Sequence, residues 1–163
     1  MTNAPTKRAP IAKAQLMIRK PVGQVFEAMV DPALTSRFWF SKGSGRLEAG
    51  KRVRWEWEMY GVHADVDVKE IEPDRRILVE WSGYEAPTPV EWRFEPKGAD
   101  RTFVTVENWG FGGEAEKAMA SALDSAGGFA FQLAGLKVFL EYGIDPKFVL
   151  DHAPDHLVAG WVR

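Results

Sequence analysis

The chain has 163 residues and a mass of 18.3 kDa, the size of one ordinary domain. Because 45% of its residues are hydrophobic, including seven Trp and ten Phe, disorder of the whole chain is excluded. The 21 Lys and Arg against 23 Asp and Glu give a formal net charge of -2, so nucleic acid is not an expected partner. The lack of cysteine excludes disulfides and thiol nucleophiles and favours a cytoplasmic location.

The chain shows no sign of division into several domains. Residues 1–10 carry charge and two prolines but no apolar stretch, so we expect a flexible lead-in rather than a signal peptide. No apolar run is long enough to predict membrane insertion. Without an internal repeat or a linker, residues 11–143 are predicted to form a single domain, and residues 144–163 a C-terminal extension that packs on it.

The first elements are predicted to be a strand and two short helices. Residues 11–19 alternate as a half-buried strand does, and residues 22–29 have apolar side chains at helical spacing. Asp31 followed by Pro32 ends this helix and can cap a second one.

A hairpin follows. Residues 52–59 alternate cleanly between apolar and charged side chains, and residues 62–69 do the same after a plausible tight turn at residues 60–61. This turn would place Glu56 opposite Asp65, a repulsive pair, so the register is provisional.

Three further strands and one long helix complete the predicted chain. The strands cover residues 76–83, 90–95 and 102–109, and a simple meander is the expected sheet order. Residues 114–142 have a helical period, with apolar side chains beyond one stripe, so we expect an enclosed core helix. The glycine pair at residues 127–128 predicts a kink. The stripe consists of Met119, Ala122, Ala126, Phe129, Leu133, Leu136 and Leu140.

The order of these elements is that of the helix-grip fold, and two segments carry a family resemblance. Residues 25–32, followed by Phe38-Trp39-Phe40, and the pattern over residues 127–143 resemble the START/SRPBCC superfamily, in its branch of activator of heat shock protein 90 ATPase homologue-like proteins. The resemblance covers about residues 11–143. It implies an α+β fold in which a strongly twisted antiparallel sheet of about six to seven strands wraps around the long C-terminal helix.

The resemblance also implies a cavity between helix and sheet, which in the superfamily takes lipids, hydrophobic hormones or polyketides. Aromatic side chains on the predicted inward faces are candidates for its lining, although the same side chains would equally fill a core. Phe38 and Trp39 are the expected gate. The candidates are Phe38, Trp39, Trp55, Trp57, Met59, Trp81, Trp92, Asn108, Met119, Phe129 and Leu133.

Polar candidates are few. Asn108 shares the parity of Val104 and Val106 and is the best candidate for a polar group that reaches the cavity; the opposite parity would place Glu107 inside. His152 and His156 have the spacing of two zinc ligands, but Pro154 disturbs that helix and the sequence offers no third ligand, so neither a metal nor a cofactor is predicted.

No catalytic constellation is present in the sequence. The acidic pairs, Glu70 with Glu72 and Asp65 with Asp67, are typical of solvated strand faces, and no nucleophile elbow or phosphate-binding loop occurs. We therefore predict no catalytic residue, and an enzyme is not favoured.

The prediction is a binding protein for a small hydrophobic ligand such as a lipid, a polyketide or an aromatic compound. Two alternatives stay open: a protein-interaction or co-chaperone-like module, and a cyclase or hydrolase of the same superfamily. A small apolar molecule and a protein are the expected kinds of partner, and the sequence leaves monomer and homodimer undecided.

Overall fold

The computed structural model describes residues 6–153. The chain begins with strand β1 (Ala12–Ile18), helices α1 (Val22–Val30) and α2 (Pro32–Thr35), and the short strand β2 (Lys42–Gly43). Strands β3 (Arg52–Trp57), β4 (Val62–Glu72), β5 (Arg76–Trp81), β6 (Thr88–Pro96) and β7 (Thr102–Asn108) follow, with a 3₁₀ helix, η1 (Glu58–Tyr60), between β3 and β4. Helices α3 (Ala115–Tyr142) and α4 (Phe148–Asp151) complete the fold.

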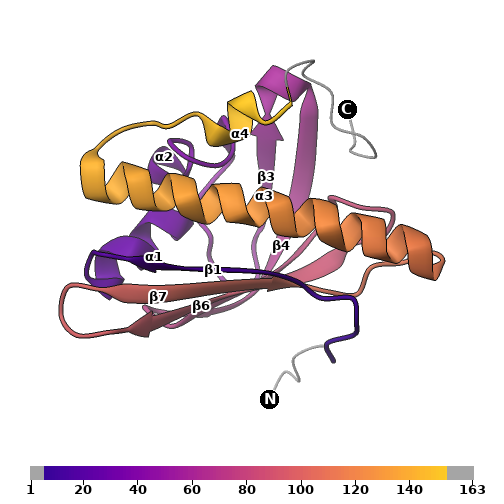
Figure 1. The fold of residues 1–163 in the computed structure, drawn as a ribbon, viewed down its shortest axis with the longest axis horizontal. Helices are drawn as coiled ribbons and strands as arrows, with labels where there is room; N and C mark the ends of the chain where they lie inside the picture. Colours follow the sequence, from indigo (N-terminus) through magenta and orange to yellow (C-terminus); the bar gives the residue numbers. More distant parts are fainter. Residues whose placement is uncertain (1–5, 154–163) are drawn as a thin grey trace.

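The seven strands form one curled antiparallel sheet in the order β1-β7-β6-β5-β4-β3-β2. From β2 to β7 each strand pairs with its neighbour in sequence, which confirms the predicted meander. The long helix α3 crosses one face of the sheet close to β1 and β7, and α1 and α2 lie toward its C-terminal end (Figure 1). The predicted α+β helix-grip fold is thus confirmed.

Local capping explains two of the helix boundaries. The Asp31 carboxylate accepts a hydrogen bond from the backbone N–H of Ala33 at 3.0 Å, at the start of α2. Gly143 has a φ of +69° and its N–H donates to the Phe139 carbonyl oxygen at 2.9 Å, which ends α3. The Asp31 cap lies where the sequence predicts it.

The predicted register of the first hairpin is wrong by two residues. Instead of a tight turn at residues 60–61, η1 bulges out between the strands, because the Tyr60 side chain turns inward and is buried. The pairing shifts as a result, and Arg54 stands opposite Asp65, with 2.9 Å between Nε and Oδ1. An ion pair therefore replaces the predicted repulsion between Glu56 and Asp65.

The long helix differs from its prediction at the glycine pair. α3 is one uninterrupted helix, so the expected kink at Gly127 and Gly128 is wrong. Within residues 6–153 no backbone approaches either glycine: a Cβ at Gly127 would meet no atom within 4 Å, and one at Gly128 would lie 3.8 Å from the Trp39 ring. The reason for the pair is therefore neither a bend nor a close crossing of chains.

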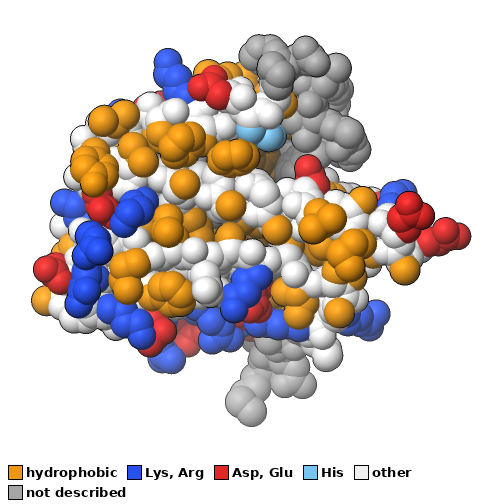
Figure 2. Space-filling model, viewed as in Figure 1, with side chains coloured by type: hydrophobic (Ala, Val, Ile, Leu, Met, Phe, Trp, Pro, Cys, Tyr) orange, Lys and Arg blue, Asp and Glu red, His pale blue; other side chains and the backbone are white. Residues whose placement is uncertain are grey.

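The expectation that α3 is enclosed on most sides is also wrong. Leu123 is 67% exposed and Met119 50% exposed, and hydrophobic side chains gather along α3 on the face shown in Figure 2. The N-terminal end of α3 extends beyond the sheet, as Figure 1 shows, so no described element covers the outer side of this part of the helix. Along the described chain, no helix combines the length and apolar character needed to cross a membrane.

The face of the sheet that points away from α3 carries an ion-pair network centred on Glu91 of β6. This carboxylate is 3% exposed and accepts hydrogen bonds from Arg76 Nε at 2.7 Å and Arg93 Nε at 2.8 Å. Burial raises the pKa of the Glu91 carboxyl, but the bonds from Arg76 and Arg93 outweigh burial and lower it below its usual value. Glu91 is therefore a charged group that the fold keeps ionised.

Candidate functional site

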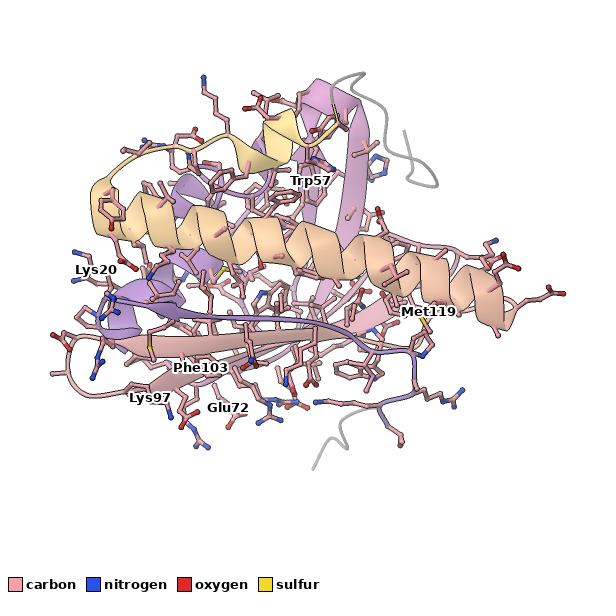
Figure 3. The ribbon with its side chains drawn as sticks, viewed as in Figure 1. Lys20, Trp57, Glu72, Lys97, Phe103 and Met119 are labelled. Carbon is pink, nitrogen blue, oxygen red and sulfur yellow. The ribbon has the colours of Figure 1, made fainter. Side chains whose placement is uncertain are left out.

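A pocket of about 250 Å³ opens where the middle of α3 passes the β3–β4 hairpin and α4. Its walls also include the loop after α2 and the end of β5 with the loop that follows. Figure 3 shows Trp57 in this region, beside α3 and close to α4. Aromatic rings form much of the wall: Trp39, Trp57, Tyr60, Trp81, Tyr84 and Phe129.

The rings of this wall are packed against one another. Phe129 lies at the centre, stacked on Trp39 with 5.5 Å between ring centroids and tilted against Trp81 at 5.4 Å. Trp39 in turn meets Trp57 edge to face at 5.4 Å. Because each ring is held by another, the aromatic surface of the pocket is largely preformed.

The structure distributes the predicted lining residues among five environments. Trp39, Trp57, Trp81 and Phe129 line the pocket, and Trp39 also lines a second hollow together with Phe38 and Met59. Trp55, Trp92 and Leu133 belong to the packed core. Met119 is exposed near the N-terminal end of α3, as Figure 3 shows, and Asn108 is buried outside the pocket.

The glycine pair of α3 lies in the pocket wall. Any larger side chain at Gly127 or Gly128 would add volume on this side of the helix, and glycine in a helix interior costs about 1 kcal/mol relative to alanine. The open space around Gly127 indicates that the pair keeps this stretch of the wall free of side chains.

A buried polar network behind the wall ties the sheet to α3. The Asn108 amide donates to Thr88 Oγ1 at 2.9 Å and to the Pro89 carbonyl at 2.8 Å, and its oxygen accepts from Ser125 Oγ at 2.7 Å. Thr88 Oγ1 also accepts from Trp81 Nε1 at 3.1 Å. Asn108 therefore lies inward, on the parity favoured by the sequence, and fixes Ser125 and Trp81 in the wall without touching the pocket itself.

One carboxylate among the described residues lines the pocket, that of Asp124 on α3. Tyr84 donates its hydroxyl hydrogen to Asp124 Oδ2 at 2.9 Å. Burial, and secondly the negative charge of Asp124, raise the pKa of the Tyr84 hydroxyl well above its usual value. Tyr84 therefore remains a neutral hydrogen-bond donor at physiological pH.

At the opposite rim, Tyr60 connects the hairpin to the C-terminal segment. Its hydroxyl lies 2.7 Å from the Leu150 carbonyl oxygen and 3.1 Å from His152 Nδ1, and burial raises its pKa. His152 Nδ1 is 2.6 Å from the Val149 carbonyl oxygen, which only accepts, so Nδ1 carries the hydrogen. In the neutral ring, Nε2 is then the acceptor.

The sequence identifies only part of this set. It places Tyr60 in a turn and His152 in the C-terminal extension, and it singles out none of Tyr84, Asp124 and Ser125. A polar residue inside a helical stripe is a signal that could have identified Ser125, because it shares the buried face with Ala122 and Phe129. An acid, a histidine and two tyrosines thus lie together in the described wall of the pocket.

Two other hollows differ from this pocket in the way their walls are built. A hollow of about 320 Å³ lies between the loop after α2 and the C-terminal segment. Another, of about 520 Å³, is bordered by charged side chains such as Arg76 and Glu72, which lie 3.4 Å apart and pair with each other. An apolar ligand would gain little free energy of binding in the charged hollow.

The family model described as Activator of Hsp90 ATPase homolog 1-like protein matches residues 19–141. Protein SSP2350 from Staphylococcus saprophyticus is similar, with 28% identity and a TM-score of 0.69 over 82% of this chain and 93% of that chain. DynU16, from the dynemicin biosynthetic locus, has 26% identity and a TM-score of 0.72 over 85% of this chain and 49% of that chain.

The Aha1 dimer from Colwellia psychrerythraea shares the fold, with 19% identity and a TM-score of 0.68 over 82% of this chain and 97% of that chain. No protein of curated function matches the chain significantly. Because the family model spans most of the sequence, the chain belongs to the family of Activator of Hsp90 ATPase homolog 1-like proteins.

Proposed function

We propose that the chain is a cytoplasmic binding protein for a small hydrophobic molecule, such as a lipid, a polyketide or an aromatic compound. The observation that carries this proposal is the preformed aromatic pocket around Phe129, Trp39, Trp57 and Trp81. Concave, mostly apolar sites with a few polar groups are the usual form of small-molecule sites.

The size of the pocket limits the ligand. A volume of about 250 Å³ lies just below the range of roughly 300–1,000 Å³ typical of drug-sized ligands. A compact ring system therefore fits better than a long acyl chain.

A titration with 2-naphthylmethanol, followed by tryptophan fluorescence, tests the proposal. We expect saturable quenching, because the pocket brings the probe against three of the tryptophans. In Gly128→Leu the added side chain lies beside Trp39, and the affinity should fall at least about tenfold, since about 1.4 kcal/mol is lost.

Ala130→Leu is the matched control, because it enlarges an exposed position of the same helix outside the pocket. It should bind the probe as the unmodified protein does. If neither 2-naphthylmethanol nor any of a panel of other neutral ring compounds quenches the fluorescence saturably, the proposal is wrong.

A protein-interaction role of the co-chaperone kind is the second candidate. The exposed apolar side chains Leu123, Phe131 and Phe148 favour it, since they border or adjoin the pocket and offer a surface for a partner. Sedimentation velocity of the chain with purified Hsp90 tests this role. We expect a complex that Leu123→Ser weakens, and sedimentation of the two proteins as separate species would rule it out.

A further inference from the structure

Asp124 is an unneutralised charge in an otherwise aromatic site. An ionised carboxylate can accept about four hydrogen bonds, and the structure shows it accepting one, from Tyr84. No Lys, Arg or His among the described residues lies within ion-pair distance of it. Lys117, on the same helix, instead pairs with Glu85 at 3.2 Å.

The position of Asp124 is not explained by the helix. A carboxylate stabilises the positive end of a helix dipole only in its first turn, whereas α3 begins at Ala115 and places Asp124 in its third turn. The hydrogen bond from Tyr84 holds the carboxylate at the rim, and the ring of Tyr84 is itself fixed between Trp81 at 6.2 Å and Phe111 at 5.4 Å. The carboxylate is therefore oriented, not merely solvated.

Aromatic faces beside a fixed carboxylate are complementary to a cation. Ammonium groups are attracted by the faces of Trp and Tyr rings as well as by carboxylates. The described wall contains four titratable side chains: Asp124, the two tyrosines and His152. Of these, His152 could carry a positive charge, but it does not neutralise Asp124. An anionic ligand would meet this uncompensated negative charge, and a neutral one would leave it unused.

We infer that the ligand of this pocket is a hydrophobic amine, with its ring system against Phe129 and the tryptophans and its ammonium group on Asp124. This inference rests on the proposed binding function and names the ligand class. Asp124 is exposed, so water weakens the ion pair, and we expect a preference for an amine over a neutral analogue of about tenfold rather than a thousandfold.

Three probes with one ring system test the inference. The affinities of 2-naphthylmethylamine, 2-naphthylmethanol and 2-naphthoate are measured at pH 7 by tryptophan fluorescence. The expected order is amine, then alcohol, then carboxylate, and the ratio of amine to alcohol affinity should decrease at high salt because an exposed ion pair is screened.

The variant Asp124→Asn removes the charge but keeps an oxygen that can accept the hydrogen bond from Tyr84. It should reduce the amine-to-alcohol ratio to about one. The matched control is Glu116→Gln, which removes one negative charge from an exposed position of the same helix, outside the pocket, and should keep the ratio at about ten. Thermal unfolding of both variants verifies that they are folded.

The outcomes separate this inference from the proposed function. If the alcohol binds saturably but the amine binds no more tightly, or if Asp124→Asn keeps the preference, the amine assignment is overturned and the binding function stands. If none of the three probes and none of the panel of neutral ring compounds binds to the unmodified protein, the binding function fails and the inference fails with it.

Discussion

The two halves of α3 face the same sheet but create different interiors. In the C-terminal half, Phe129, Leu133 and Leu136 are fully buried and fill the space above the sheet. In the N-terminal half the buried residues are small, namely Ala118, Ala122 and Ser125, and the glycine pair follows them. The comparison teaches that the volume of the inward side chains on one helix decides between core and cavity.

Polar contacts separate the two halves as well. In the C-terminal half, Gln132 accepts a hydrogen bond from Trp92 Nε1 at 2.8 Å, deep in the core, while its own Nε2 has no partner among the described residues. In the N-terminal half, Ser125 donates to Asn108, whose amide hydrogens both have acceptors. Asn108 on the pocket side is thus fully bonded where Gln132 is not, although Trp39 Nε1 in the pocket wall also lacks a partner among the described residues.

The largest effect is expected from truncating a leucine in the packed half. Leu133→Ala should lower the free energy of unfolding by about 2–5 kcal/mol, because it leaves a cavity that the surrounding core cannot fill. Leu123→Ala is the matched change in the other half, where the side chain is largely exposed, and it should change stability by less than about 0.5 kcal/mol. Urea unfolding measures both, and similar losses would contradict the difference between the halves.

A second substitution affects the sheet on which both halves of α3 pack. Glu91→Gln should cost about 1.5–3 kcal/mol at pH 7, because a buried carboxylate that accepts from two guanidinium groups is replaced by a neutral amide. Glu95→Gln, on the exposed part of the same strand, is the control and should have little effect. Probe binding should be unchanged in Glu91→Gln, since the network lies on the face away from α3.

The Glu91 carboxyl also predicts how the free energy of unfolding depends on pH. The pKa of Glu91 is lower in the folded chain than in the unfolded one, so its stabilisation is complete above the unfolded value of about 4.3. It is lost as the pH falls from there through the folded pKa. The stability difference between the unmodified protein and Glu91→Gln should therefore shrink in this acidic range, and a difference that is constant from pH 7 to pH 3 would contradict the assignment.

Ser125→Ala is expected to have an intermediate effect of about 1–2 kcal/mol. It leaves the buried Asn108 oxygen without a donor, and it loosens the network that holds Trp81 in the pocket wall. Ser121→Ala, one turn earlier on α3 and less buried, is the control with a smaller expected effect. Urea unfolding gives the cost, and equal costs for both serines would show that the network does not stabilise the fold.

The smallest change in stability is expected from replacing a glycine of α3 by alanine, and its sign differs between the two halves of the helix. Gly127→Ala should stabilise the protein by about 0.5–1 kcal/mol and raise its Tm by about 2 °C, because the added Cβ meets no atom and alanine favours the helix. Gly135→Ala in the packed half should destabilise it, since its Cβ would lie 3.0 Å from the Phe38 side chain and 3.1 Å from the Phe38 carbonyl oxygen. Calorimetry of the two variants decides whether the signs differ.

The sequence predicts β1, the meander from β3 to β7 and the Asp31 cap, because each depends on residues close together in the chain. The register of the first hairpin does not depend on nearby residues in this way. It is set by Tyr60, whose hydroxyl binds backbone carbonyls about ninety residues away, including that of Leu150. The inward position of Ser125 likewise depends on Asn108, a partner on the sheet. A pattern search along the chain cannot detect such pairs.

The candidate site is predicted only in part for a related reason. Trp55, Trp57, Trp81 and Trp92 all belong to strands whose apolar faces point inward, and alternation treats them alike. Whether an indole fills the core or lines a pocket depends on which part of α3 lies above it. The structure places Phe129 against Trp92 at 5.8 Å, so that end is filled, and leaves Trp57 at the open end.

The pairing of β1 with β7 has a consequence for the order of synthesis. Ala12 pairs with Asn108, so β1 leaves the ribosome well before β7 and finds this neighbour only after the residues between them have been translated. Until then β1 is an open strand edge, which invites pairing with other chains. Lys13 and Gln15 are both exposed in the folded sheet. Their polar side chains lie along the nascent strand and reduce the risk that it pairs with another chain before β7 is made.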